Sequence, residues 1–244
     1  MNKTLQIQLS KDYCCTPEEA VGRDNIFTVY TPLEGRRKFQ EKGECILKIC
    51  AVNGKLLVTG REDIVSVCRD KYSSWDGAWF MEAQTIIELE SIVRKYGYKI
   101  KQLHPFYISE EIMPPVPYDF DTVYYTRNEI EQFRDDDRFD EAFAFCDDTP
   151  DVLGIAAVKN GGIIGMAGAS EDSPYMYQIG INVLPEYRGN GIGAALVNLI
   201  KNKVLELGKL PYYGTSVSHI ASQKTALKAG FVPAWTELLT EKGE

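Results

Sequence analysis

The sequence predicts an α+β fold, in which a mixed, mainly antiparallel central sheet is flanked by helices and is joined to a second, smaller αβ domain. Apolar runs separated by glycine-containing turns alternate with helical patterns. The chain has 244 residues, enough for one or two domains. A proline-rich segment interrupts the pattern near the middle. We expect an accessory domain over residues 1–112, a linker over 113–119 and the main domain over 120–244.

The first half is αβ in character. Residues 46–58 are expected to form two short strands around the turn Asn53-Gly54, a dipeptide typical of two-residue hairpins. Two helices and a further strand are expected at residues 61–71, 81–96 and 98–103, the helices because apolar residues recur at helical spacing. This half carries no functional motif, but Trp75 and Trp79 are candidates for a lid over a substrate pocket.

The proline-rich segment at the expected domain boundary lies within a strongly acidic stretch. Residues 113–117 include three prolines, which fix φ and donate no backbone hydrogen bond, so the segment is interpreted as a linker. Residues 109–151 hold 14 acidic side chains against three arginines, although the whole chain carries only −8. This acidic stretch is either a solvated linker and helix face or a rim that attracts amines.

The second half begins with a short strand at 120–125. A hairpin is expected over residues 152–169 around Asn160-Gly161-Gly162, followed by a strand at 175–184. The other expected elements are short helical pieces at 128–133 and 139–145, a long helix at 193–207, a strand at 211–216, a helix at 221–229 and an extended segment from 231.

A glycine-rich loop connects the strand at 175–184 to the long helix. Gly189, Gly191 and Gly193 lie within five residues. Glycine tolerates positive φ, and the first turn of a helix presents unpaired N–H groups at the positive end of the helix dipole. The loop therefore predicts a phosphate or pyrophosphate site, with Arg188 as a nearby cation. It lacks the Gly-Lys-Ser/Thr ending of a P-loop and the Gly-x-Gly-x-x-Gly of a dinucleotide turn.

The loop resembles the acetyl-CoA signature of the GNAT superfamily. The matching positions are Val183, Pro185, Tyr187, Arg188, Gly191 and Gly193. Downstream, residues 227–231 read Leu-Lys-Ala-Gly-Phe and resemble the family's second landmark, a short helix that ends in Gly-Phe before a strand. The resemblance covers roughly residues 120–239, and the first half is interpreted as a possible degenerate copy of the same fold.

The resemblance implies an N-acetyltransferase that moves acetyl from acetyl-CoA, its co-substrate, to a primary amine of a small molecule or peptide by direct attack. Backbone N–H groups of residues 188–194 would bind the pyrophosphate, and the strand at 181–183 would pair with pantetheine where it splays from the strand at 211–216. The implied CoA-binding residues are Ile181, Val183, Arg188, Gly189, Asn190, Gly191, Ile192, Gly193, Ala194, Ser218, His219 and Ser222. For the two serines, helix capping is the alternative interpretation.

The sequence departs from the family at two positions. His219 stands where the family often has asparagine, and Ala226 stands where it often has the tyrosine that protonates the thiolate. The candidate catalytic residues are His219, Tyr177 and Glu171. The alternative for His219 is a hydrogen-bonded loop histidine, and the alternative for Glu171 is a turn residue.

Two other functions remain open: a non-catalytic acyl-CoA-binding sensor module, and a GNAT-fold transferase with a different acyl donor. The net charge of −8 argues against a nucleic-acid partner. No apolar run reaches the ~18 residues of a membrane span, and the N-terminus does not resemble a signal peptide. Six cysteines without a CxxC pair and two histidines without metal spacing predict no metal site. We expect a cytoplasmic monomer or homodimer.

Overall fold

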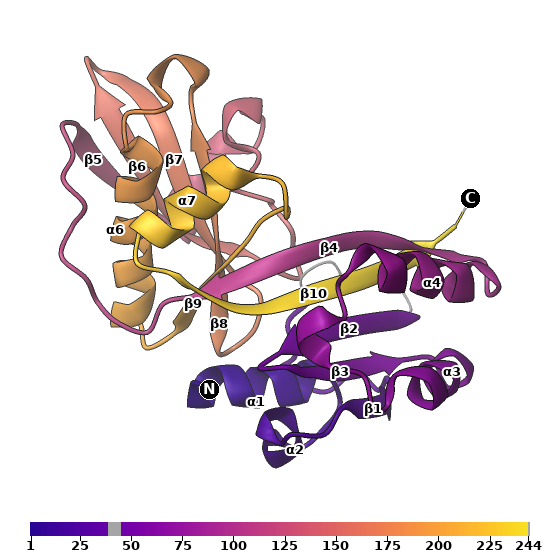
Figure 1. The fold of residues 1–244 in the computed structure, drawn as a ribbon. Coiled ribbons are helices and arrows are strands. Elements are labelled where there is room, and N and C mark those ends of the chain that lie inside the picture. The colour runs from indigo at the N-terminus through magenta and orange to yellow at the C-terminus, as the bar shows by residue number, and fades with distance from the viewer. Residues whose placement is uncertain (39–44, 244) are drawn as a thin grey trace. The chain divides into compact units, whose positions relative to one another are not determined.

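A computed structural model describes residues 1–38 and 45–243 as a mixed fold of helices and mainly antiparallel strands (Figure 1). The mixed, mainly antiparallel architecture with flanking helices agrees with the predicted fold class. The chain divides into two compact units. Unit 1 comprises residues 1–106 and 234–244, and unit 2 comprises residues 107–233.

This division differs from the predicted boundaries in its last segment. The sequence assigned everything after residue 119 to one domain, whereas the strand β10 (Val232–Lys242) pairs antiparallel with β2 (Leu47–Val52), Thr236 lying opposite Ala51. Backbone hydrogen bonds between strands far apart in the sequence leave no local signal. The chain therefore returns to the N-terminal unit after completing unit 2.

Unit 1 contains a sheet in the order β1-β3-β2-β10-β4, in which β1 runs parallel to β3 and the β3–β2 and β2–β10 pairs are antiparallel. Its other elements are α1 (Lys3–Asp12), α2 (Pro17–Val21), β1 (Ile26–Val29), β3 (Lys55–Gly60), α3 (Glu62–Tyr72), η1 (Gly77–Trp79), α4 (Ala83–Arg94) and β4 (Tyr98–Ile108). Trp75 and Trp79 are exposed on the connection between α3 and α4, and their role as a lid stays a prediction.

The predicted hairpin of unit 1 is confirmed. Asn53 and Gly54 both have positive φ, 49° and 78°, which suits the two-residue turn between β2 and β3. The helices at 61–71 and 81–96 are confirmed as α3 and α4. By contrast, α1, α2 and β1 were not predicted, although Thr16 and Glu19 form a capping box at the start of α2, a signal readable in the sequence.

A buried ionic cluster holds the N-terminal helix to the last strand within unit 1. The Arg37 guanidinium donates to Asp12 Oδ2 at 2.5 Å and to Glu237 Oε2 at 2.7 Å, and Tyr13 Oη donates to Glu237 Oε2 at 2.8 Å. All four side chains are buried. Because an unpaired charge is costly in the interior, the arginine and the two carboxylates stabilise the unit only together.

Unit 2 contains a sheet in the order β9-β8-β7-β6-β5, antiparallel except for the β8–β9 pair. Its elements are β5 (Asp121–Thr126), α5 (Arg127–Ile130), η2 (Glu131–Phe133), η3 (Asp137–Phe139), β6 (Asp151–Lys159), β7 (Gly162–Glu171), β8 (Met176–Val183), η4 (Pro185–Tyr187), α6 (Ile192–Glu206), β9 (Leu210–Gly214) and α7 (Ile220–Lys228). The strands and helices predicted for residues 120–229 are confirmed, except for the helical piece at 139–145. The 3-10 turn η3 ends at Phe139, and residues 140–145 form no helix. No helix in the described ranges is long and apolar enough to cross a membrane.

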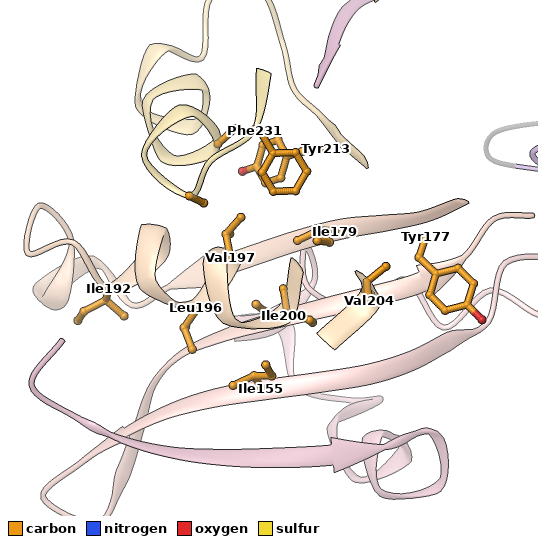
Figure 2. Close-up of a cluster of buried hydrophobic side chains, with 14 of the residues drawn as sticks. Ile155, Tyr177, Ile179, Ile192, Leu196, Val197, Ile200, Val204, Tyr213 and Phe231 are labelled. Atoms are coloured by element: carbon orange, nitrogen blue, oxygen red, sulfur yellow. The ribbon is translucent and has the colours of Figure 1, made fainter. Parts of the chain in front are cut away.

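The core of unit 2 lies between α6 and one face of the sheet. Leu196, Val197, Ile200 and Val204 project from α6 toward Ile179 and other odd-numbered residues of β8, as Figure 2 shows. The alternation of β8 thus directs its odd positions to the core. The α7 helix packs against α6, so both helices lie on this side of the sheet (Figure 1).

The proline-rich segment is a strap on α6. Three α6 side chains bind its backbone: Lys201 Nζ donates to the Glu111 carbonyl, Asn202 exchanges two hydrogen bonds with Met113, and Asn198 Oδ1 accepts from the Val116 N–H. Residues 198, 201 and 202 share a helix face. The prolines between the bonded positions need no N–H partner. The segment predicted as an inter-domain linker therefore belongs to unit 2.

Candidate functional site

The parallel strands β8 and β9 pair over only three residues. The register joins Met176 to Leu210 and ends where Gln178 lies opposite Tyr212. Beyond that pair, β8 continues to Val183 and β9 to Gly214 without a further paired residue in the described register. The backbone edges of both strands are then available to a ligand that lies between them in an extended conformation.

The glycine-rich loop follows β8 and leads directly into α6. Gly189 and Gly191 both have φ of +81°, a conformation in which any other residue would be strained. Gly191 is the N-cap of α6, and no side chain caps the helix there. A Cβ added to Gly189 or Gly191 would meet nothing within 4 Å. Residues 188–191 are exposed, and the first N–H groups of α6 lie without a side-chain cap at the positive end of the helix dipole.

Gly193, in the first turn of α6, lies between the end of β8 and α7. A Cβ on Gly193 would lie 3.5 Å from Thr225 Cγ2 and 3.6 Å from Val183 Cγ2, both ordinary van der Waals contacts. The side of α6 that carries Gly193 thus faces the end of β8 and α7. The open helix terminus and the free edge of β8 consequently border the same region of unit 2.

Polar side chains of the loop hold its backbone. Arg188 Nε donates to the Val183 carbonyl at 2.9 Å, which folds the arginine back onto the end of β8. Asn190 Nδ2 donates to the carbonyls of Tyr187 and Arg188 at 3.2 and 3.3 Å. Arg188 and Asn190 remain exposed, so a cation and an amide stand beside the open helix terminus.

The predicted site residues of α7 lie at and just after its start. His219 is exposed and is the N-cap of α7, but its side chain makes no capping bond. Instead, Gln223 holds the preceding loop by donating to the Ser216 and Val217 carbonyls at 3.2 and 2.9 Å. Ser218 Oγ contacts Ser216 Oγ at 3.3 Å. Helix capping and CoA binding by Ser218 both stay predictions.

Ser222 is bound to a buried tyrosine. Its Oγ lies 2.8 Å from Tyr213 Oη, and Tyr213 comes directly after Tyr212, the last β9 residue of the ladder. The pKa of Tyr213 is raised above its ordinary value. Burial is the main cause and the charge of Glu141 adds to it, while the hydrogen bond with Ser222 acts in the opposite direction. Ser222 is a site residue that the sequence predicts, whereas Tyr213 is not, because only the packing of β9 against α7 joins them.

Tyr177 and Glu171 lie at the other end of β8. They form a cross-strand pair between β8 and β7, six residues before Val183 and so ~20 Å along the strand from the glycine loop. Figure 2 shows Tyr177 at the end of the cluster opposite Ile192. Burial, followed by the charge of Glu171, raises the pKa of Tyr177. Their catalytic roles, like that of His219, stay predictions.

The opposite face of the sheet carries a row of three glycines that sequence analysis overlooked. Gly154, Gly168 and Gly180 lie directly across from one another on β6, β7 and β8. A Cβ on Gly168 would stand 1.9 Å from the Ala142 carbonyl oxygen, and one on Gly180 would stand 1.9 Å from that of Glu141. The backbone of residues 141–143 therefore lies directly on the sheet.

Asn182 locks that segment in place. Its Oδ1 accepts from the N–H groups of Glu141 and Ala142 at 3.0 and 2.7 Å, and its Nδ2 donates to Asp140 Oδ1 at 3.0 Å. Because Asn182 is the neighbour of Ile181 and Val183 on β8, the same strand edge supports the acidic segment on one face and borders α6 on the other.

A buried hydrogen-bond network sits where the β8–β9 ladder ends. Tyr212 Oη donates to Asp172 Oδ2 in a very short contact and lies 3.1 Å from Gln178 Oε1, while Ser170 Oγ donates to Asp172 Oδ1 at 2.7 Å. Asp172 and Tyr212 are both buried. The network ties β7, β8 and β9 together at the point beyond which β8 and β9 no longer pair.

Comparison with known proteins identifies the class of this domain. Residues 117–231 match the model of the acetyltransferase (GNAT) family. The chain therefore carries a GNAT acetyltransferase domain over these residues, as the loop and the Gly-Phe landmark predicted. No curated protein matched the chain.

Several solved structures are similar to this chain at low sequence identity. They include a GCN5-related N-acetyltransferase-like protein from Streptococcus suis, with 18% identity and a TM-score of 0.46 over 65% of this chain and 68% of that one. A GCN5-related N-acetyltransferase from Kribbella flavida has 14% identity and a TM-score of 0.48, covering 63% of each chain. A GNAT-family acetyltransferase from Colwellia psychrerythraea has 14% identity and a TM-score of 0.45 over 80% and 81%.

Proposed function

We propose that this protein is an N-acetyltransferase that moves the acetyl group of acetyl-CoA to a primary amine of a small molecule or peptide. The observation that carries the proposal is the uncapped start of α6. Two left-handed glycines lead into it, and a Cβ on either would meet nothing within 4 Å. The start of α6 suits the pyrophosphate of CoA, because the free N–H groups and the dipole of a helix start favour anions.

The residues of unit 2 fit the rest of the co-substrate. The Arg188 N–H donates to the Pro185 carbonyl at 3.3 Å, so the N–H groups of residues 189–194 would hold the pyrophosphate, with the Arg188 side chain nearby. The unpaired edge of β8 at Ile181 and Val183 would accept the amides of pantetheine as an added strand. Bound acetyl-CoA supplies an activated thioester, and the chain supplies the position in which an amine nitrogen reaches it.

Calorimetry with CoA tests the binding half of this proposal. The variant is Gly191→Asp, which places a carboxylate at the α6 terminus, and the matched control is Gly161→Asp. Gly161 has a similar φ of +77° and equally open surroundings, but lies in the β6–β7 hairpin. We expect Gly191→Asp to weaken CoA binding about tenfold or more, because like charges ~5 Å apart repel. The control should bind like the wild type.

Thiol release from acetyl-CoA in the presence of a panel of primary amines and lysine-containing peptides tests the catalytic half. Turnover on a panel member establishes the transferase and begins to define its acceptor. CoA binding without turnover on any amine would favour the sensor module over the enzyme. Equal CoA affinity in Gly191→Asp and Gly161→Asp, or no binding at all, would overturn the assignment of the loop.

A further inference from the structure

Acetyl transfer from a thioester leaves a negative sulfur that must take up a proton. The GNAT family often has a tyrosine in the helix before Gly-Phe for this purpose. At that position α7 has Ala226, which is fully buried and whose methyl side chain has no proton to donate. The following inference rests on the proposed function and concerns which group of unit 2 performs that protonation.

Tyr213 is the first residue of β9 beyond the ladder with β8. The register ends at the pair of Gln178 and Tyr212, so Tyr213 begins the part of β9 that no longer pairs. Its side chain points to the α6 and α7 side of the sheet and is 3% exposed. The backbone of Tyr213 therefore lies at the border of the region proposed for the thioester.

The hydroxyl of Tyr213 meets α7 one turn before Ala226. Tyr213 Oη lies 2.8 Å from Ser222 Oγ, and Ser222 and Ala226 are four residues apart, on one helix face. Tyr213 and Ala226 belong to the same buried cluster, in which the Tyr213 ring lies 6.0 Å from that of Phe231 (Figure 2). The phenol of Tyr213 thus lies against the face of α7 on which Ala226 contributes only a methyl group.

We propose that Tyr213 is the proton donor to the leaving thiolate of CoA, and that Ser222 positions the Tyr213 hydroxyl. The amine nitrogen attacks the acetyl carbonyl carbon, the C–N bond forms, and the C–S bond breaks with its electron pair on sulfur. The O–H proton of Tyr213 passes to that sulfur and yields the CoA thiol. The proton lost by the new amide nitrogen passes through water to the phenolate and restores Tyr213.

The surroundings of the hydroxyl fit this role. Burial keeps Tyr213 protonated because it raises the pKa of the phenol, while the Ser222 hydrogen bond acts against that rise and stabilises the phenolate. The neighbouring Tyr212 differs, because its hydroxyl is engaged with Asp172 and Gln178. Successive residues of a strand point to opposite faces, so only Tyr213 of this pair faces α7.

The kinetic test compares wild type, Tyr213→Phe, Ser222→Ala and the control Tyr107→Phe, which removes a buried hydroxyl from the same core cluster. The acceptor is the panel amine that the wild type acetylates fastest. With acetyl-CoA, we expect Tyr213→Phe to lower kcat about 100-fold, Ser222→Ala to lower it less, and Tyr107→Phe to leave it unchanged. With the selenoester analogue of acetyl-CoA, whose leaving selenolate is a much weaker base, the Tyr213→Phe defect should largely disappear.

A second measurement needs no acceptor. The ultraviolet absorbance of the thiolate reports the pKa of the CoA thiol bound to each variant. Loss of a hydrogen-bond donor to the thiolate in Tyr213→Phe should raise that pKa by about one to two units, which corresponds to a charge-assisted hydrogen bond. Calorimetry of CoA binding confirms that each variant is folded and loaded.

The outcomes separate the two proposals. Wild-type turnover together with an unchanged kcat and an unchanged thiol pKa in Tyr213→Phe would overturn the assignment of Tyr213 and leave the transferase intact. An equal kcat loss with thioester and selenoester would also overturn it, because the defect would then not lie in protonation of the leaving group. Absence of CoA binding and of turnover in the wild type would overturn the proposed function and this inference together.

Discussion

Replacing Gly168 by alanine tests how closely the segment of residues 141–143 lies on the sheet of unit 2. The added Cβ would stand 1.9 Å from the Ala142 carbonyl oxygen and 2.8 Å from Phe143 Cδ1. Ordinary van der Waals contact begins at 3.4 Å, so the carbonyl would have to retreat by about 1.5 Å. The obstacle is backbone, which cannot rotate away as the end of a flexible side chain can.

The cost of that retreat follows from what holds the segment. Asn182 binds the N–H groups of Glu141 and Ala142, and a shift of about 1.5 Å breaks or stretches both bonds. Overpacking costs about 1–3 kcal/mol, and each weakened hydrogen bond adds about 0.5–1.5 kcal/mol. We expect Gly168→Ala to reduce the free energy of unfolding of unit 2 by about 2–6 kcal/mol.

Urea unfolding of Gly168→Ala beside Gly162→Ala provides the measurement. Gly162 lies on the same strand, its φ is not in the left-handed region, and its added Cβ would meet only the Lys159 carbonyl oxygen at 3.8 Å. The control should therefore unfold within about 0.5 kcal/mol of the wild type. Coincident unfolding curves for the two variants would refute the close approach of residues 141–143 to β7.

Two further predictions concern buried charges. Arg37→Met should destabilise unit 1 by about 3–5 kcal/mol in urea unfolding, because it leaves Asp12 and Glu237 buried without the guanidinium that pairs them; a loss below 1 kcal/mol would contradict that pairing. Burial lowers the pKa of Lys201 in the folded chain below its usual 10.5. Between the lowered pKa and 10.5, the unfolded chain binds more protons than the folded chain. The contribution of Lys201 to stability therefore rises as the pH rises toward 10.5. Lys201→Met should remove that part of the pH dependence in thermal unfolding as the pH approaches 10.5, and an unchanged profile would show that Lys201 is not desolvated.

The sequence alone specified the local geometry of the glycine-rich loop before α6. Gly189, Gly191 and Gly193 act through their own φ angles and through the helix that follows directly, so the signal is contained in one short stretch. The odd-position alternation of β8 is equally local, because successive strand residues always point to opposite faces. Turns such as Asn53-Gly54 were predictable for the same reason, since two residues define them.

Tertiary structure alone decided which distant groups meet. Tyr213 and Ser222 meet only because β9 packs against α7, and the row of Gly154, Gly168 and Gly180 exists only through the cross-strand register. The strap of residues 111–116 reads as a linker until Lys201 and its neighbours bind its backbone, and β10 joins unit 1 through pairing with β2. Pattern and turn chemistry act over a few residues, whereas register and face-to-face packing depend on segments that no local signal connects.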